Sequence, residues 1–308
     1  AVSPAFLEGC NKMDLIIVPS EHSKKGFADS VYDKMKDTPN GKQKDGELKL
    51  EKPMEVLFEG ADEEIYKPLN TKEIDSEFFD WLNEEVPEKF AFLVVGQWTQ
   101  GNFGEDRKDL GTTVKLFYEA FANKKKQPAL IMKTNGATYS VMDREQCKQK
   151  IDDIKKLFPK DWKLPNIYIL HGDLTPTEMN YLYNHPKVKS MISFTHGEGF
   201  GRPLLEATMT GLPVMVSDWS GHKDFLNPEL TLMLPGTLNN IPPSMVWKDI
   251  LIKESKWFYI DGNGAYKSLN YLYENIDLMK TKSKEQMKNN RENFTLNSMT
   301  NKLDEIVT

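Results

Sequence analysis

Residues 189–217 read KSMISFTHGEGFGRPLLEATMTGLPVMVS, and this stretch contains a strand, a loop, a helix and a second strand in that order. Its two ends, KSMISF and LPVMVS, are short and mostly apolar, which is typical of buried strands. The three glycines of THGEGFG indicate a loop, and Pro203 suits the first turn of the helix that follows. The stretch therefore predicts a βαβ unit whose two strands run parallel.

The same alternation of short apolar runs with longer amphipathic or polar stretches continues through most of the chain. Apolar strands flanked by helices are typical of a parallel sheet that is covered on both faces. We therefore expect an α/β fold with a doubly wound parallel sheet. Such sheets bind their ligands at the carboxyl ends of the strands, so the loops after the strands are the candidate sites. The other apolar runs are DLIIVP, MEVLF, FAFLVVG, PALIMK and NIYIL.

The composition indicates a globular chain. Its 308 residues are 39% hydrophobic and 28% charged, which suits one large core or two smaller ones. The formal net charge of -6 argues against nucleic acid as a partner. No apolar run reaches the roughly 20 residues of a membrane span, and the first residues lack the layout of a signal peptide, so we expect a cytoplasmic protein. Cys10 and Cys147 lie far apart and predict neither a disulfide framework nor a structural metal site.

Two polar segments suggest how the chain is divided. Residues 37–53 contain Gly and Pro among charges and are expected to form an exposed loop. Residues 59–75 resemble a linker, which predicts a first domain over 1–72 and a second domain over 73–308.

The end of the chain predicts a surface helix over residues 294–306. Four apolar residues recur there at helical spacing among charges, which predicts one buried stripe. These residues are Phe294, Met299, Leu303 and Ile306.

The loop THGEGFG and the helix after it carry two acids, Glu198 and Glu206, with seven residues between them. Free N–H groups at a helix N-terminus favour a phosphate or diphosphate. Carboxylates beside such a site would accept hydrogen bonds from sugar hydroxyls. The pair therefore suits a ligand with a diphosphate in the middle and hydroxyl-rich groups at both ends. The helix dipole alone also favours acids in a first turn, so this loop by itself does not define a site.

A second loop, residues 97–111, follows the strand FAFLVVG and ends with Arg107 and Lys108. Both side chains are suited to a diphosphate leaving group. The alternative is a solvated pair that answers the preceding acids Glu105 and Asp106. Because both loops follow strands of one sheet, they can converge on one site.

Five stretches between residues 89 and 308 resemble, in order, the C-terminal half of a retaining glycosyltransferase of family 4, in the GT-B architecture. Glu198 and Glu206 resemble the E-x7-E motif of that family. The segment CNKMDLIIVPSEHSKKGF resembles the end of the first GT-B domain. The resemblance therefore implies a Rossmann-like nucleotide-sugar-binding domain together with a remnant of a second Rossmann-like domain. The five stretches are FLVVGQW, RKDLGTTVKLFYEAF, NIYILHGDLTPTEMNYLY, SFTHGEGFGRPLLEATMTGLPVMVSDWSGHKDF and RENFTLNSMTNKLDEI.

The resemblance also implies roles for individual residues. Glu206 would hold the ribose hydroxyls, Glu198 would face the donor sugar, and Arg107 and Lys108 would contact the diphosphate. Leu174 stands where the family packs the base. The remaining residues implied to line the nucleotide-sugar site are Gly96, His196, Gly199, Phe200, Gly201, Pro203, Leu204 and Leu205.

Two features limit this assignment. Gln97 stands where many family members have arginine, and Asp224 is a weak match for the usual glutamate. A histidine in a tight loop is also more often a hydrogen-bonded structural residue than a catalyst, which applies to His196. For His222 we expect contact with a phosphate through either its ring or its backbone.

The implied reaction is hexosyl transfer from a nucleotide-diphosphate donor with retention of configuration. No Asp-x-Asp motif is present, so we expect no metal and no cofactor, and cationic side chains would stabilise the leaving group. The base of the donor (uracil, guanine or adenine) and the acceptor, a glycan, lipid or protein, are not specified. We expect the acceptor domain on further sequence or on a partner chain, and an exposed terminal helix would favour self-association. The alternatives are a non-catalytic nucleotide-sugar-binding module and a sugar-nucleotide epimerase of the same architecture.

Overall fold

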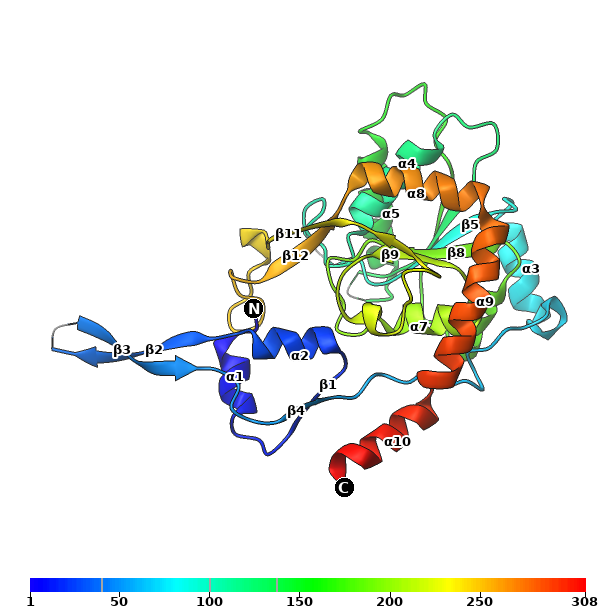
Figure 1. Cartoon of the computed structure of the whole chain (residues 1–308). Helices are drawn as coiled ribbons and strands as arrows, with labels where there is room; N and C mark the ends of the chain where they lie inside the picture. Colours follow the sequence, from blue (N-terminus) through cyan, green and yellow to red (C-terminus); the bar gives the residue numbers. More distant parts are fainter. Residues whose placement is uncertain (40, 100, 137) are drawn as a thin grey trace.

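The computed structural model describes residues 1–39, 41–99, 101–136 and 138–308 (Figure 1). Its centre is a six-stranded sheet in the order β10-β9-β8-β5-β6-β7, in which all neighbouring strands are parallel. The predicted α/β fold with a doubly wound parallel sheet is therefore confirmed. The strands are β5 (Ala91–Val95), β6 (Ala129–Lys133), β7 (Ile167–Leu170), β8 (Val188–Ser193), β9 (Val214–Ser217) and β10 (Leu232–Leu234).

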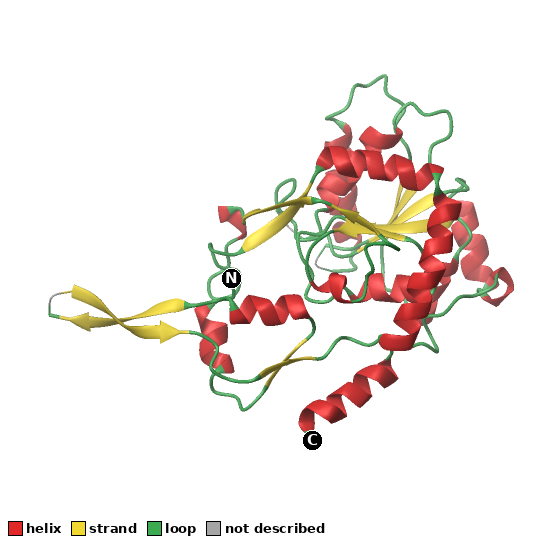
Figure 2. Cartoon of the chain, viewed as in Figure 1, coloured by secondary structure: helices red, strands yellow, loops and turns green. Residues whose placement is uncertain are grey.

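Helices cover both faces of this sheet (Figure 2). Strand β5 shows why, because its alternate side chains enter two separate cores. Ala91 and Leu93 join the core formed with α3, α6 and α7, whereas Phe92 and Val94 join the core formed with α4, α5 and α8. The helices are α3 (Ser76–Glu85), α4 (Leu110–Phe121), α5 (Val141–Lys155), α6 (Pro176–Asn184), α7 (Arg202–Met209) and α8 (Gly262–Glu274).

The N-terminal part of the chain forms a small unit beside the carboxyl ends of the central strands. Strand β1 (Ile16–Val18) pairs in parallel with β4 (Met54–Val56), and helices α1 (Pro4–Cys10) and α2 (Glu21–Ala28) accompany them. A parallel pair joined through a helix fits the expected remnant of a second Rossmann-like domain. The proposed boundary after residue 72 stays a prediction.

The prediction of an exposed loop over residues 37–53 is wrong. Strands β2 (Tyr32–Thr38) and β3 (Gly41–Leu48) form an antiparallel hairpin that projects away from the rest of the chain (Figure 1). Nearly all of its described residues are exposed, so no alternation of apolar and polar residues marks the strands in the sequence. Sequence also did not predict the antiparallel pair β11 (Gly236–Asn240) and β12 (Lys256–Ile260), which lies beside the site loops.

After α9 (Ile276–Asn293), the chain ends in helix α10 (Leu296–Val307). The predicted terminal helix is therefore present, but the expected buried stripe is wrong, because α10 has no buried residue. Its N-terminal end is held by a β-bridge between Ala61 and Thr295, and the preceding Phe294 packs on Phe58 and Phe225. The short 3-10 helices are η1 (Thr71–Glu73), η2 (Gly221–Asp224) and η3 (Pro243–Met245). Within the described residues, no helix combines the length and apolarity needed to cross a membrane.

The two-sided burial of β5 gives a stability prediction. Leu93 is fully buried, so Leu93→Ala should lower the free energy of unfolding by about 2–5 kcal/mol through lost burial and a cavity. Urea denaturation measures this change. The matched control is Leu157→Ala, because Leu157 is 63% exposed and its loss should change the stability by less than about 0.5 kcal/mol. Equal effects of the two substitutions would contradict a sheet buried on both faces.

Candidate functional site

The loops after β5 and β8 meet at the Glu198 carboxylate. Lys108 Nζ lies 2.7 Å from Glu198 Oε1, and Arg107 Nη1 lies 2.8 Å from Oε2. Arg107 also donates to the Gly197 carbonyl at 2.8 Å, and the His196 amide donates to the Arg107 carbonyl at 2.9 Å. The predicted convergence of the two loops is thus present, and Arg107 and Lys108 are not the solvated partners of Glu105 and Asp106.

The charges of Glu198, Lys108 and Arg107 interact strongly. Glu198 is only 8% exposed, and burial alone would raise the pKa of its carboxyl group. The adjacent cations, Lys108 and then Arg107, outweigh that effect and lower the pKa of Glu198 to about 2. The carboxylate is therefore ionised over the whole physiological range. Lys108 is largely buried beside it, whereas Arg107 is half exposed and free to contact a ligand.

Gly96 makes room for Lys108. A Cβ atom at position 96 would lie 3.1 Å from three carbons of the Lys108 side chain, which is tighter than an ordinary contact. Glycine at the end of β5 therefore lets the lysine stem pass over the backbone and reach Glu198.

The backbone of the glycine loop is anchored through its carbonyl groups. The Glu198 carbonyl accepts a hydrogen bond from Gly221 N at 3.1 Å, and the Gly199 carbonyl accepts one from Ser20 Oγ at 2.5 Å. Glu198 N itself donates to Ser220 Oγ at 2.8 Å. Gly201, with φ of +104°, then begins α7 without a side-chain cap.

The next four amide groups are unpaired. Among the described residues, no protein acceptor is present for the N–H groups of Gly199, Phe200, Gly201 and Arg202. They lie at the N-terminus of α7, where the helix dipole adds positive potential. This backbone is therefore able to receive an anionic or hydroxyl-bearing ligand.

Glu206 lies on α7 in a different environment from Glu198. Its carboxylate accepts a hydrogen bond from Tyr183 Oη at 3.2 Å, lies 3.5 Å from Arg202 Nη2 and shares its cavity with Tyr66. Burial raises the pKa of Glu206, and these three neighbours partly oppose the shift. Tyr66 comes from the segment that was expected to be only a linker.

The two acids line two separate cavities. Glu198 lines a cavity of about 610 Å³ together with Arg107, His22 and Trp219. Glu206 lines one of about 370 Å³ that is also bordered by Arg202, Tyr66, Pro176 and Leu205. The helix start between the acids thus separates two spaces, each with its own carboxylate.

Several predicted site residues are placed by packing. His196 is buried, stacks on Trp257, and its two ring nitrogens lie 2.8 Å from the Phe258 carbonyl and 3.1 Å from the Gly104 carbonyl. Phe200 and Leu204 are core residues, so their route to a ligand is through the backbone. Leu174 packs against that same core, and Pro203 lies in the first turn of α7.

His222, which the sequence suggested as a phosphate contact, is buried with Nε2 2.7 Å from the Ser217 carbonyl. Other residues at the site were missed from sequence. Ser220 and Gly221 hold the Glu198 backbone. Ser20, from the N-terminal unit, holds Gly199. The sequence signal for Ser20 was its position after an apolar strand. Its contact with Gly199 left no further signal, because long-range contacts of single hydroxyl groups produce no periodic pattern.

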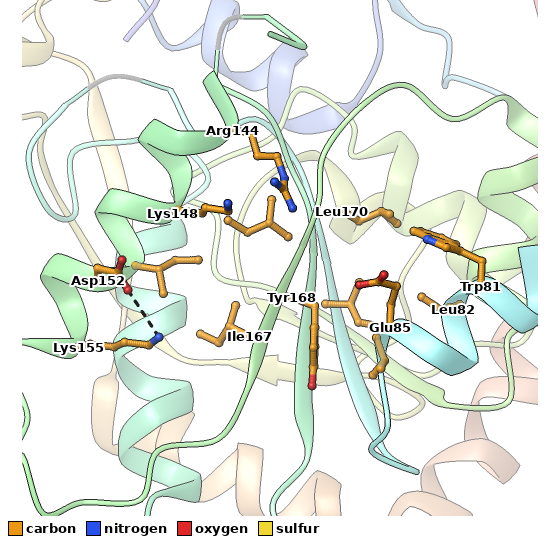
Figure 3. Close-up of a pocket in the computed structure, with 14 residues that line it drawn as sticks. Trp81, Leu82, Glu85, Arg144, Lys148, Asp152, Lys155, Ile167, Tyr168 and Leu170 are labelled. Carbon is orange, nitrogen blue, oxygen red and sulfur yellow. Dashed lines mark ion pairs between the residues drawn. The ribbon is translucent and has the colours of Figure 1, made fainter. Parts of the chain in front are cut away.

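Another hollow lies away from these loops. Figure 3 shows it at the open edge of β7, between α3 and α5, with a volume of about 320 Å³. Trp81 and Glu85 line one side and Arg144 and Lys148 the other. It contains none of the predicted site residues, so the candidate site remains at the carboxyl ends of β5 and β8.

Comparison with known proteins establishes the fold class. No protein-family model matches the chain, and a search of the curated proteins returns no match. The chain is similar to solved structures of sucrose-phosphate synthase from Thermosynechococcus elongatus (13% identity, TM-score 0.65), a glycosyltransferase from Rickettsia africae (15%, 0.64) and HepE from Anabaena (14%, 0.63). The likeness covers 98%, 98% and 99% of this chain. These neighbours are GT-B glycosyltransferases, and the chain shares their Rossmann-like fold.

The chain is shorter than these neighbours. It spans 59% of the sucrose-phosphate synthase structure, 66% of the Rickettsia structure and 67% of HepE. At such low identity the likeness concerns the fold, so activity and substrate are argued from the site itself.

The contact between Gly221 and the glycine loop can be tested. A Cβ atom at position 221 would lie 2.1 Å from the Gly199 carbonyl oxygen, so Gly221→Ala must displace the loop. We expect a loss of about 1–3 kcal/mol of unfolding free energy, measured by urea denaturation. Gly9→Ala is the control, because a Cβ on Gly9 meets nothing within 4 Å and alanine favours helix α1. A stable Gly221→Ala protein would show that the loop is not confined there.

The Glu198 ion pairs predict a specific pH dependence. The folded-state pKa of about 2 lies below the usual glutamate value of 4.5, so this contribution is fully present above about pH 4.5 and is lost as the pH falls towards 2. Lys108→Met raises the pKa of Glu198 and should lower the unfolding free energy at pH 7 by roughly 1.5–3 kcal/mol. The difference between variant and wild type should shrink on acidification through that window.

Urea denaturation between pH 7 and pH 3 measures this difference. Lys156→Met is the matched control, because Lys156 forms an exposed 2.7 Å pair with Asp153. A constant separation between the wild-type and Lys108→Met curves down to pH 3 would show that Glu198 does not depend on Lys108.

Proposed function

We propose that this chain binds a nucleotide-diphosphate sugar and, as a retaining hexosyltransferase of family 4, transfers the sugar to an acceptor without a metal ion. The observation that carries the proposal is the Glu198 carboxylate, which is held by Arg107 and Lys108 at the start of four unpaired backbone N–H groups. Cations and free amides suit a diphosphate, and an ionised carboxylate beside them suits sugar hydroxyls.

In this proposal Arg107 and Lys108 contact Glu198 in the unliganded site and the diphosphate after it binds. Without ligand they neutralise Glu198. When a diphosphate binds, Arg107 and Lys108 contact its oxygens and stabilise the negative charge that builds on the β-phosphate as the anomeric C–O bond breaks. Glu198 then faces the donor sugar, where its charge stabilises an oxocarbenium-like ring.

The second cavity suits the other end of the ligand. Glu206 already accepts hydrogen bonds, one from the hydroxyl group of Tyr183 and one from Arg202. Ribose hydroxyls can replace or add to these donors in the cavity of about 370 Å³. A ligand with hydroxyl groups at both ends and a diphosphate between them matches two carboxylates in two cavities separated by a helix N-terminus.

The neighbours give a choice of probe. HepE was solved with UDP and glucose and also with UDP-glucose, and these ligands belong to that protein. We propose a nucleotide sugar as the ligand of this chain because of the chemistry of its site. UDP, GDP and ADP are the nucleotides to compare. The acceptor in this proposal is a glycan, a lipid or a protein, and the exposed apolar residues Leu296, Leu303 and Val307 of α10 favour self-association.

Calorimetric titration tests the proposal. The chain should bind one of UDP, GDP and ADP, together with its sugar conjugate. Glu206→Gln removes a charge-assisted hydrogen bond to ribose, which should cost roughly 1.5–3 kcal/mol, or about a 10- to 150-fold loss of affinity. Glu305→Gln on exposed α10 is the matched control. Unchanged binding in Glu206→Gln would overturn the assignment.

Turnover separates the proposal from its alternatives. A transferase consumes the donor only with an acceptor, keeps the anomeric configuration in the product and remains active with EDTA. A binding module leaves the donor intact, and an epimerase converts it without an acceptor.

A further inference from the structure

Helix α2 of the N-terminal unit touches the glycine loop through one buried hydroxyl group. Ser20 is fully buried and caps α2, because its Oγ accepts a hydrogen bond from Ser23 N at 3.1 Å. The same Oγ lies 2.5 Å from the Gly199 carbonyl oxygen and 3.1 Å from Ser23 Oγ. Its single proton goes to the nearer Gly199 carbonyl, since Ser23 has a hydroxyl proton of its own.

This hydrogen bond fixes the direction of an unpaired amide. The Gly199 carbonyl and the Phe200 N–H belong to one trans peptide group and point in opposite directions. When Ser20 holds the carbonyl, the Phe200 N–H is directed away from α2, where no described residue accepts it. If the peptide group rotated, the carbonyl oxygen would replace the N–H group and repel an anionic ligand.

Two further contacts keep α2 in place. Glu21 N donates to Asp224 Oδ2 at 2.8 Å, and the His22 ring meets the Trp219 ring edge-on at a centroid distance of 5.0 Å. Both partners follow β9, so α2 rests on the loops after two neighbouring strands. Gly221 closes the other side of the Gly199 carbonyl, since even a Cβ there would lie 2.1 Å from the oxygen.

We propose that Ser20 is a positioning residue for the nucleotide-sugar site: its hydroxyl group holds the Gly199 carbonyl and so presents the Phe200 amide to the ligand. This inference rests on the proposed function. It gives a residue of the N-terminal unit a role in positioning the ligand, whereas Arg107, Lys108 and Glu198 follow strands of the central sheet.

A role in helix capping alone would not require this geometry. A cap needs only an oxygen that accepts from the helix, whereas Ser20 also uses its proton towards a residue 179 positions away. Ser3 provides the comparison within the chain. It is equally buried and caps α1 by accepting from Ala5 N at 3.2 Å, and no described site residue bonds to its side chain.

The first experiment compares Ser20→Ala, Ser20→Thr and Ser3→Ala by calorimetric titration with UDP-glucose, UDP, GDP and ADP. Ser20→Ala should weaken binding of whichever ligand the wild type binds by about tenfold. This is the expected effect of losing the one hydrogen bond from the Phe200 amide to a charged ligand. Ser20→Thr keeps the hydroxyl group and should stay within about threefold of wild type, as should Ser3→Ala.

The second experiment measures amide hydrogen exchange of residues 196–205 without any ligand. Ser20→Ala should speed exchange in this segment, because the amides of His196, Gly197 and Glu198 depend on a fixed loop. Ser3→Ala and Ser20→Thr should leave it as in wild type. This readout decides whether Ser20 holds the loop even if no nucleotide binds.

The outcomes separate this inference from the proposed function. If Glu206→Gln abolishes binding while Ser20→Ala binds as wild type, the role of Ser20 is overturned and the nucleotide site stands. If Ser3→Ala acts like Ser20→Ala, the effect belongs to helix capping and the inference is again overturned. If exchange responds only to Ser20→Ala but no nucleotide binds, Ser20 positions the loop and the proposed function is wrong.

Discussion

The anionic state of Glu198 is the constraint on which the candidate site depends. A carboxylate that is 8% exposed cannot remain ionised in a protein interior without compensation. Lys108 and Arg107 provide it, and they come from the loop of a neighbouring strand. The parallel order of β5 and β8 brings both loops to one edge of the sheet, so the fold makes the ion pairs possible and the ion pairs join the loops.

These ion pairs also give the unliganded site a defined state. Arg107 and Lys108 are gathered in one place before any anion arrives, so their ordering does not have to accompany binding. A diphosphate that recruits them leaves Glu198 with less compensation, and hydrogen bonds from a sugar can replace part of what the carboxylate loses. Charge neutrality within the site therefore links the phosphate end of the ligand to its sugar end.

The amino-acid sequence predicted the structural elements that have a local pattern and missed the elements and site residues that have none. All seven apolar runs that were expected to be strands are strands. Five of them lie in the central sheet, where burial on both faces favours uninterrupted apolar residues. The exposed hairpin β2–β3 has no buried face and so left no pattern. At the site, Glu198, Arg107 and Lys108 were found because charged residues in glycine-rich loops stand out. Ser20 acts through one hydroxyl group across a long sequence separation, which no local rule detects.

Two of the missed residues share a location, and it changes how the site is understood. Ser20 and Tyr66 both precede residue 73, yet one holds the glycine loop that follows Glu198 and the other borders the cavity of Glu206. Each acid of the pair thus has one neighbour or anchor from the N-terminal part of the chain. Both cavities are therefore lined in part by residues that precede the central sheet in the chain.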